Sequence, residues 1–480
     1  MRINPKQAAV IIKSLEGGVV PNLGIEHLLV GRNKEVEEVL GILDDVSDGG
    51  SDIRFWVGDF GSGKSFMLNT IEQFALGKNF VTSTIDLAPQ RRFYATDKKA
   101  QALYSEIVDN IKIKTARSGN VIEQIIDQWL MTIFSDLSQK NDIPMEDLLK
   151  GSNREEVRNE ILNAMASFSS VGLSFEFGEA INKYYEAFVE NDRMLKLKAL
   201  RWIRGDISTK TEAKKELGIN QIINDDNYFD ALKNLAELFL ALGYSGFVIN
   251  FDEAVNLYKI PQSVTRERNY ERILNIYNEC KSGKAKGLFV NFGATRKTVF
   301  DTNRGMSSYG ALAGRLGDEK DINSSLINTK RTALLLKPLS EEEIYTLLEN
   351  LVNIYNTNYK IDIDINQNQI IRYMEGQLNR PGADEFLTPR SVIKDFLEIL
   401  DLKRQNPDVK VDQILDGKYS NVLDHVEKDP LDQDDILLIW QIIIHFFQDR
   451  WENMYIKING HHLLRSKLLQ LKEFALVITT

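Results

Sequence analysis

The amino-acid sequence predicts an α/β fold: a parallel, doubly wound sheet with a large helical insertion and an all-helical region towards the C-terminus. Short apolar runs with the length of buried strands alternate with stretches of helical periodicity, which is the pattern of a sheet covered by helices on both faces. One run leads into a glycine-rich loop, and a long helical stretch separates two of the others. The predicted strands are Ile53–Val57, Phe80–Ile85, residues 246–254, Gly287–Phe292 and Thr332–Leu336.

The composition is that of an ordinary soluble protein of two or three domains. The chain has 480 residues, 43% of them hydrophobic and 27% charged, which is enough for a large core. Its single cysteine, Cys280, excludes a disulfide framework and fits a reducing, cytoplasmic environment. We expect neither export nor a membrane span, because no apolar run approaches roughly 18 residues. A net charge of −10 argues against indiscriminate binding to nucleic acid, although local basic patches are still able to bind it.

The loop after the first predicted strand has the spacing of a phosphate-binding loop, Gly-x-x-x-x-Gly-Lys-Ser. Its glycines allow several backbone N–H groups to point at a β-phosphate, and the helix predicted over Phe66–Leu76 places its N-terminus beside the anion. Lys64 is expected to bridge β- and γ-phosphate oxygens, and the Ser65 hydroxyl to ligate Mg²⁺. The sequence therefore predicts binding of ATP or GTP. The residues assigned to the nucleotide in this segment are Gly58, Asp59, Phe60, Gly61, Ser62, Gly63, Lys64, Ser65 and Phe66.

Polar side chains at the ends of two later strands predict a hydrolytic site. The run 246–254 ends in Asp252 and Glu253, as expected of a buried strand that delivers carboxylates to the carboxyl edge of a sheet. Asp252 is expected to hold Mg²⁺ through water, and Glu253 to orient or deprotonate the attacking water. The next strand leads to Thr295, our first choice for a γ-phosphate contact, with Asn291 as the second. The alternatives are an ordinary strand end for the two acids and turn-forming roles for Thr295 and Asn291.

Beyond residue 338 the sequence changes to helical periodicity, which predicts a small helical lid. Ser340 and Glu343 have the spacing of a capping box at a helix N-terminus. Further along, Thr388 is predicted to cap a helix whose first turn presents Arg390. An arginine at this position could reach the γ-phosphate and report hydrolysis as movement of the lid. The alternative is a solvated surface arginine.

Two arginines after the fourth strand are candidates for a residue supplied to the nucleotide of a neighbouring subunit. Arg315 is preferred because residues 311–316 are predicted to form a short helix at a subunit edge, and Arg304, in a glycine-flanked loop, is the second choice. The alternative for both is an ion pair with nearby acids such as Asp318 and Glu319.

Residues 66–251 form a far longer connection than the sheet requires, which predicts an insertion. It is predicted to contain successive amphipathic helices such as Ala100–Ile111, Val121–Leu137 and Glu155–Phe168. Residues 193–215 are the most basic part of the chain and include Trp202, which we expect to be exposed. Basic side chains with an interleaved aromatic suit a phosphate backbone and a stacked base, which favours DNA as a partner. Neighbouring acids leave a solvated helix face as the alternative.

Together, the phosphate-binding loop, the acidic strand end, the polar fourth strand and the helical lid resemble an AAA+ ATPase with a P-loop core. Near the N-terminus, Val30-Gly31-Arg32 resembles a box of the origin-recognition and initiator-type branch, in which this loop lies against the adenine. The resemblance implies ATP rather than GTP, with Arg32 in that role. The alternative is that Glu35–Leu40 simply opens a solvated helix.

Further motifs resemble the ATP-binding proteins of BREX-type anti-phage systems, and similar ATPases of Shango-type defence operons. The resemblance covers roughly residues 1–430 and implies ATP hydrolysis in prokaryotic defence, a homo-oligomer and a partner such as a helicase from the same operon. The motifs are Gly17-Gly18, Phe55-Trp56-Val57-Gly58, Ile85-Asp86-Leu87, Arg201-Trp202-Ile203-Arg204-Gly205, Arg268-Asn269-Tyr270-Glu271, Gly293-Ala294-Thr295 and Tyr309-Gly310-Ala311-Leu312-Ala313-Gly314-Arg315-Leu316.

We therefore expect an ATP-hydrolysing AAA+ protein of anti-phage defence that acts on DNA or on a DNA-bound partner. The rival from another class is a nucleotide-dependent scaffold with little turnover, and a P-loop kinase lacks an evident second substrate site. The apolar run Ile436–Phe447 could be a buried helix, a docking surface or a membrane contact. The expected divisions are 1–96 (N-terminal helix and first part of the core), 97–240 (insertion), 241–337 (rest of the core), 338–430 (lid) and 431–480 (helical tail).

Overall fold

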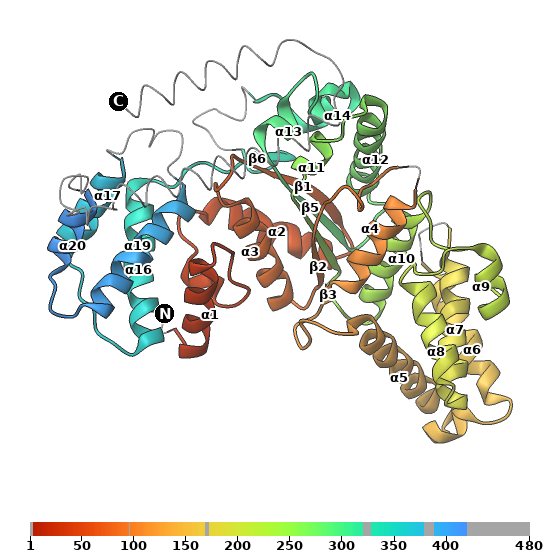
Figure 1. Ribbon diagram of the computed structural model, residues 1–480. Helices are drawn as coiled ribbons and strands as arrows, with labels where there is room; N and C mark the ends of the chain where they lie inside the picture. Colours follow the sequence, from red (N-terminus) through yellow and green to blue (C-terminus); the bar gives the residue numbers. More distant parts are fainter. Residues whose placement is uncertain (1–2, 96, 169–171, 320–327, 379–387, 420–480) are drawn as a thin grey trace, which may run out of the picture. The chain divides into compact units, whose positions relative to one another are not determined.

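A six-stranded mixed sheet forms the core of a unit that spans Met1–Leu415 (Figure 1). The computed structural model describes residues 3–95, 97–168, 172–319, 328–378 and 388–419. A second unit comprises Asp416–Thr480, and the predictions for the tail 431–480 lie outside the described residues. The strands are β1 Ser51–Val57, β2 Val81–Asp86, β3 Ile111–Lys112, β4 Phe247–Asp252, β5 Leu288–Ala294 and β6 Ala333–Leu335.

The strand order is β3-β2-β4-β5-β1-β6. All five predicted strands are present, and neighbours among them are parallel. The expectation of a purely parallel sheet is wrong, because β3 pairs antiparallel with β2. The helix predicted to reach Ile111 ends at Asp109, and the chain then turns so that Ile111 pairs with Ser83 at the sheet edge.

Helices cover both faces of the sheet, as predicted. On one face, Trp56, Val248 and Phe289 pack against apolar side chains of α2 (Asn33–Ser47) and α3 (Lys64–Gly77). On the other face, Phe55, Phe251 and Phe292 form a stack, with ring centroids 4.7 Å apart for Phe55–Phe292 and 5.0 Å for Phe251–Phe292. The remaining core helices are α4 Lys99–Asp109, α10 Tyr228–Ala241, α11 Val255–Tyr258, α12 Ser263–Lys281, α13 Arg296–Phe300 and α14 Gly310–Leu316, with the short 3₁₀ turns η1 Ile25–His27 and η3 Met306–Ser308.

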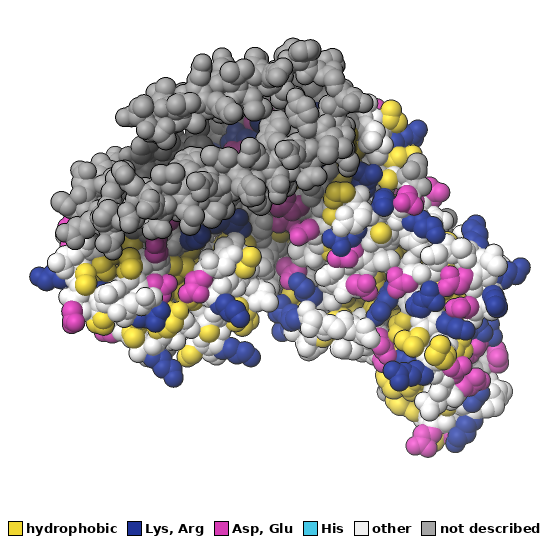
Figure 2. All heavy atoms as spheres, viewed as in Figure 1, with side chains coloured by type: hydrophobic (Ala, Val, Ile, Leu, Met, Phe, Trp, Pro, Cys, Tyr) yellow, Lys and Arg dark blue, Asp and Glu magenta, His cyan; other side chains and the backbone are white. Residues whose placement is uncertain are grey.

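The insertion between α4 and α10 is helical, as expected. Its elements are α5 Val121–Asn141, η2 Met145–Leu149, α6 Asn153–Ala166, α7 Ser174–Glu190, α8 Arg193–Ile203 and α9 Lys210–Leu217. The expectation that Trp202 is exposed is wrong: the side chain is 1% exposed, and its Nε1 donates to the Gln221 carbonyl at 2.9 Å. A buried indole cannot stack on a nucleic-acid base. On the surface of the insertion in Figure 2, basic and acidic side chains lie next to one another.

The lid helices begin where the capping residues predict. Ser340 Oγ accepts from Glu343 N at 3.3 Å, and Glu343 Oε2 accepts from Ser340 N at 2.8 Å, which closes the predicted capping box. Thr388 Oγ1 accepts from Ser391 N at 3.2 Å. The lid helices are α16 Glu341–Tyr359, α17 Gln367–Leu378, α19 Pro389–Gln405 and α20 Val411–Tyr419.

The N-terminal helix α1 (Pro5–Glu16) packs against the lid helices α16 and α19. At one end of this contact, the Tyr359 hydroxyl donates to Glu16 Oε1 at 3.3 Å. The segment between α1 and α2 therefore connects an element packed on the lid to one packed on the sheet. Among the helices that the structure describes, none combines the length and apolarity needed to cross a bilayer.

Candidate nucleotide-binding site

The predicted phosphate loop connects β1 to α3 and has a conformation that requires its glycines. Gly61 and Gly63 have φ of 80° and 95°, in the left-handed region that favours glycine. A Cβ on Gly58 would lie 2.3 Å from Ser62 Oγ, and a Cβ on Gly61 would lie 2.8 Å from Thr388 Cβ. The loop thus packs tightly on itself and against the start of α19. Ser62 Oγ is buried and has no hydrogen-bond partner within the described part of the chain, so it is positioned to bind an added polar group.

Lys64 begins α3 and faces a group of acids. Its Nζ donates to the Asp59 carbonyl at 2.7 Å and lies 5.5 Å from the centroid of the Phe60 ring. Burial lowers the pKa of Lys64, and the negative charges of Asp252, Glu253 and Asp59 oppose that effect. A partly buried lysine surrounded by several acceptors is suited to binding phosphate oxygens.

The acidic pair lies at the carboxyl end of β4, as predicted. Asp252 is the last residue of the strand, and its Oδ1 accepts from the Glu253 N–H at 2.8 Å. Glu253 is exposed and has φ of 54°, which is uncommon for a residue other than glycine and is typical of functional sites. Asp86 lies opposite Asp252 at the end of β2, and burial together with the Asp252 charge raises the pKa of the Asp86 carboxyl. Sequence reasoning did not assign Asp86 to the site, although it too is a polar residue at a strand end.

The two candidates from the fourth predicted strand have different surroundings. Thr295 lines the cavity beside the loop and caps α13, with its Oγ1 accepting from Thr298 N at 3.2 Å. Asn291 is fully buried within β5, does not line the cavity, and accepts a hydrogen bond from Trp56 Nε1 at 3.0 Å. The geometry therefore favours Thr295 over Asn291 as the residue that meets a γ-phosphate.

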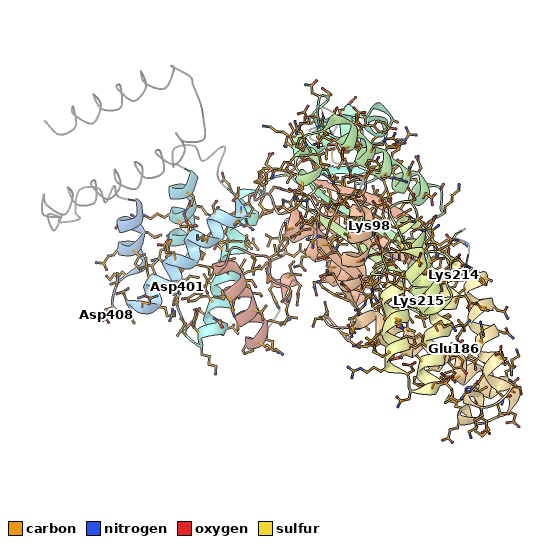
Figure 3. The ribbon with its side chains drawn as sticks, turned by 45° about the vertical axis from the view of Figure 1, so that its right-hand side comes forward. Lys98, Glu186, Lys214, Lys215, Asp401 and Asp408 are labelled. Atoms are coloured by element: carbon orange, nitrogen blue, oxygen red, sulfur yellow. The ribbon has the colours of Figure 1, made fainter. Side chains whose placement is uncertain are left out.

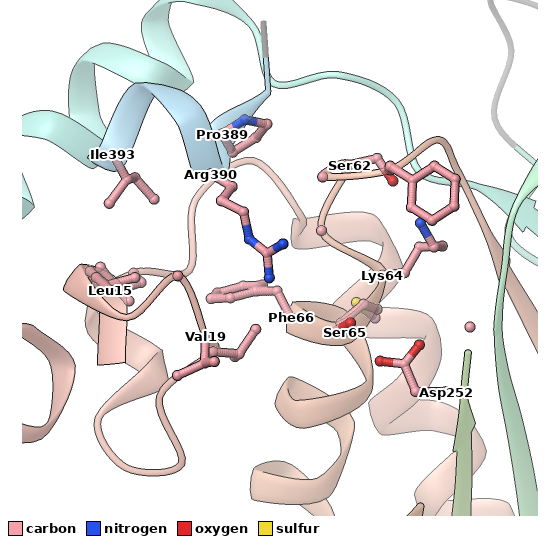
Figure 4. Close-up of a pocket in the computed structure, with 18 of the residues that line it drawn as sticks. Leu15, Val19, Ser62, Lys64, Ser65, Phe66, Asp252, Pro389, Arg390 and Ile393 are labelled. Atoms are coloured by element: carbon pink, nitrogen blue, oxygen red, sulfur yellow. The ribbon is translucent and has the colours of Figure 1, made fainter. Parts of the chain in front are cut away.

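A single cavity brings the predicted elements together (Figure 4). Lys64, Ser65 and Asp252 lie on one side of it, and Val19 on the other. Gly58 and Asp59 do not line the cavity. The loop residues that do are Phe60, Gly61, Ser62, Gly63, Lys64, Ser65 and Phe66.

The opposite wall is apolar, and sequence reasoning did not identify it. Its residues come from α1 and the following segment and from the lid. Arg32 also lines the cavity; it is 9% exposed, and its Nη2 donates to the Lys337 carbonyl at 2.7 Å. An apolar wall opposite a phosphate loop suits the flat base of a nucleotide. The residues of this wall are Leu15, Val19, Val20, Pro21, Leu28, Val30, Leu339, Leu347, Pro389 and Ile393.

Arg390 projects from the first turn of α19 into the cavity, towards Phe66 (Figure 4). Arg390 and Lys64 line the same cavity, and the positive charge of Arg390 contributes to lowering the Lys64 pKa. Within the described part of the chain, Arg390 has no hydrogen bond or ion pair. An exposed arginine and a lysine that line one cavity are suited to binding the same anion.

The two candidate arginines for a neighbouring subunit lie outside the cavity. Arg304 is held by its own chain, because its Nε donates to the Tyr258 carbonyl at 2.8 Å and its Nη2 to the Ile260 carbonyl at 3.1 Å. Arg315 is exposed and donates to the Ala311 carbonyl of its own helix at 2.8 Å. Of the two, Arg315 is the one whose side chain is exposed.

Ser65 and Asp252 provide two oxygen ligands at the same edge of the cavity, which is the donor chemistry that Mg²⁺ prefers. Within the described residues, no group of three or more potential metal ligands from His, Cys, Asp and Glu occurs.

A comparison with known families identifies the family of this chain. Residues 3–418 match the family described as BREX system ATP-binding protein BrxC/D, which covers the loop, the acidic strand end and the described lid helices. No curated protein matches this chain. From the match over most of its length, the chain belongs to the BREX system ATP-binding protein family BrxC/D.

Proposed function

We propose that this protein hydrolyses ATP as an AAA+ ATPase of anti-phage defence, acting on DNA or on a DNA-bound partner. The observation that carries the proposal is that Asp252 and Glu253 line the same cavity as Lys64 and Ser65. A protein that only held ATP would need the loop but would not need an exposed carboxylate at the end of β4.

In this proposal the triphosphate lies along the loop from Gly58 to Ser65, with Lys64 bound to its β- and γ-oxygens. Ser65 and Asp252 would hold Mg²⁺, which neutralises phosphate charge when bound. Glu253 orients the attacking water and accepts its proton, and Thr295 donates to the γ-phosphate. The base lies against the apolar wall, beside Arg32.

The lid completes the site. Because Arg390 has no acid partner among the described residues, a γ-phosphate would be a strong attractor for its guanidinium. Loss of that phosphate removes the attraction, and movement of α19 would then report hydrolysis. Arg315 from a neighbouring subunit would complete the active site, so that the working form is a homo-oligomer.

The support for a DNA partner comes from α9 and not from the whole basic stretch. Arg201 is ion-paired with Glu212 at 3.0 Å and with Glu216 at 3.8 Å, so the two acids of α9 are turned towards α8. A surface groove is lined by Lys210, Thr211, Lys214, Lys215 and Asn220. Within the described residues no ion pair involves the three lysines, two of which are labelled in Figure 3. Three lysines in one groove, none of them ion-paired with a described residue, suit a phosphate backbone.

The test is ATP turnover with and without DNA. Replacing Glu253 by Gln keeps the shape of the side chain and removes the base, so turnover should fall by about 10²–10⁴-fold while ATP binding is retained. Asp252→Asn should instead weaken binding and its Mg²⁺ dependence together. Turnover of Glu253→Gln at the wild-type rate would leave a nucleotide-dependent scaffold as the better description.

DNA binding is measured by fluorescence anisotropy over a range of salt concentrations. We expect weaker DNA binding from the triple variant Lys210→Glu, Lys214→Glu, Lys215→Glu. The slope of log binding constant against log salt concentration should become shallower by about 0.9 for each of these lysines that binds a phosphate in the wild type. A triple variant with the same charge change at exposed lysines elsewhere, Lys140→Glu, Lys284→Glu, Lys286→Glu, is the control. If both triples weaken binding equally, only net charge matters and the groove has no specific role.

A further inference from the structure

Arg296 contacts acidic residues from two different segments. It begins α13 immediately after Thr295. Its Nε lies 3.4 Å from Asp59 Oδ2 in the phosphate loop, and its Nη1 lies 3.4 Å from Glu319 Oε1. One guanidinium group thus links the loop after β1, the end of β5 and the segment that follows α14.

Asp59 makes this link relevant to nucleotide binding. Its carboxylate contacts Arg296, while its carbonyl accepts from Lys64 Nζ and, at 3.2 Å, from the backbone N–H of Ser62. Asp59 does not line the cavity itself. A displacement of the Asp59 side chain would therefore move the backbone carbonyl that Lys64 and Ser62 contact. Both of these residues line the cavity.

Glu319 makes the link relevant to the edge of the molecule. It follows α14, which ends at Leu316, and the intervening Gly317 has φ of 81°. The same helix carries Arg315, whose side chain is exposed. Contact between Arg296 and Glu319 therefore fixes the chain just beyond the candidate trans arginine.

We infer that Arg296 is a positioning residue that couples occupancy of the phosphate loop to the segment carrying Arg315. This inference rests on the proposed function. Phosphates in the loop add negative charge beside Asp59, which draws the Arg296 cation towards the loop and weakens its contact with Glu319. Filling one subunit's site thereby changes how that subunit presents Arg315 to its neighbour. Both ion pairs are partly exposed, so each is worth at most about fivefold in an equilibrium constant.

The experiment is a double-mutant cycle on ATP affinity. Asp59→Asn and Arg296→Gln should each raise the dissociation constant of Mg-ATP by about two- to fivefold, and the double variant by no more than either alone. Arg296→Lys keeps the charge and should restore part of the loss. Glu319→Gln should leave ATP affinity unchanged or slightly tighter, because it removes a carboxylate that competes with the loop for Arg296.

The matched control is Arg268→Gln, which breaks an exposed Arg268–Glu271 pair of the same 3.4 Å length away from the loop. Dissociation constants are measured by nucleotide titration, independently of turnover. A wild type that binds ATP without hydrolysing it would therefore refute the proposed function and leave this test intact. Additive effects of Asp59→Asn and Arg296→Gln, or effects no larger than that of Arg268→Gln, would overturn the coupling.

The link between Arg296 and the presentation of Arg315 is tested with Glu319→Gln, whose ATPase activity is measured over a range of protein concentrations. Altered presentation of Arg315 should change kcat at saturating ATP without a matching change in KM. Unchanged kcat at every protein concentration would restrict the role of Arg296 to the loop and overturn the link to the subunit edge.

Discussion

Replacing Lys64 by Ala should abolish stabilisation by nucleotide while leaving the free protein almost as stable as wild type. Among the described residues, the Lys64 ammonium has one hydrogen bond, to the Asp59 carbonyl, and one cation–π contact, with the exposed ring of Phe60. Water can replace both contacts, so their loss costs at most about 1 kcal/mol. With a triphosphate present, the same lysine would meet several oxygens, and its loss removes the main cation of the loop.

The size of the effect follows from mass action. Mg-ATP at about 100 times its dissociation constant should stabilise the wild type by roughly 2.7 kcal/mol. At about 2.1 cal/mol/K per residue, the unit Met1–Leu415 has an unfolding entropy of about 0.9 kcal/mol/K, so the melting temperature should rise by about 3 °C. The Lys64→Ala protein should show almost no rise. Differential scanning fluorimetry with and without Mg-ATP measures both values.

A second lysine provides the control for this measurement. Lys78 follows the other end of α3 and is ion-paired with Asp44 on the surface. Lys78→Ala should change the melting temperature of the free protein little and should retain the full rise with Mg-ATP. If Lys64→Ala shows the same rise as wild type and Lys78→Ala, the assignment of the loop to nucleotide binding is wrong.

Two further predictions concern the lid and the neighbouring subunit. Gly61→Ala and Gly218→Ala each place a side chain at a left-handed φ, at a cost of about 1–2 kcal/mol. Only at Gly61 would the new Cβ meet Thr388. Only the Gly61→Ala variant should therefore bind ATP more weakly in a nucleotide titration. Equal affinities in the two variants would remove the contact with α19 from the binding mechanism. Arg315→Ala should lose turnover but recover it on mixing with inactive Lys64→Ala, since one protein contributes the loop and the other the arginine. Full activity of Arg315→Ala alone at low protein concentration would exclude this residue.

The strands and the loop could be predicted because their signals are local. Apolar runs of strand length and fixed glycine spacing are read directly from the sequence, and the same holds for the capping residues Ser340 and Thr388. Strand β3 was missed because it has two residues and follows a helical pattern without an obvious break. The alternation Ile111-Lys112-Ile113-Lys114 was the available signal.

Trp202 shows how a local pattern was misread. The basic residues around it suggested exposure, but Ala199, Leu200, Trp202 and Ile203 are all buried, and together they form the apolar face of α8. Helical periodicity applied to this short stretch would have placed the indole inside. The charged residues of a helix show which face is exposed to solvent, but they do not show that the residues between them are exposed too.

The apolar wall of the cavity could not be predicted, because its members are far apart in the sequence. Leu15 and Val19 lie near the N-terminus and Ile393 lies in the lid, and none of the three stands in a sequence motif that marks a nucleotide site. The close approach of Gly61 to Thr388 is likewise a long-range contact that no local motif encodes. Such contacts depend on the packing of the lid against the phosphate loop and against α1.

In the proposed function, that packing would give the lid two separate interactions with a nucleotide. Ile393 and the segment after α1 would contact the base, whereas Arg390, one turn earlier on α19, would contact the γ-phosphate. ADP and ATP share the first interaction and differ in the second. Hydrolysis would therefore weaken the lid's attachment to the phosphate loop but keep its contact with the base. A lid with this property reports the nucleotide state while the product is still bound.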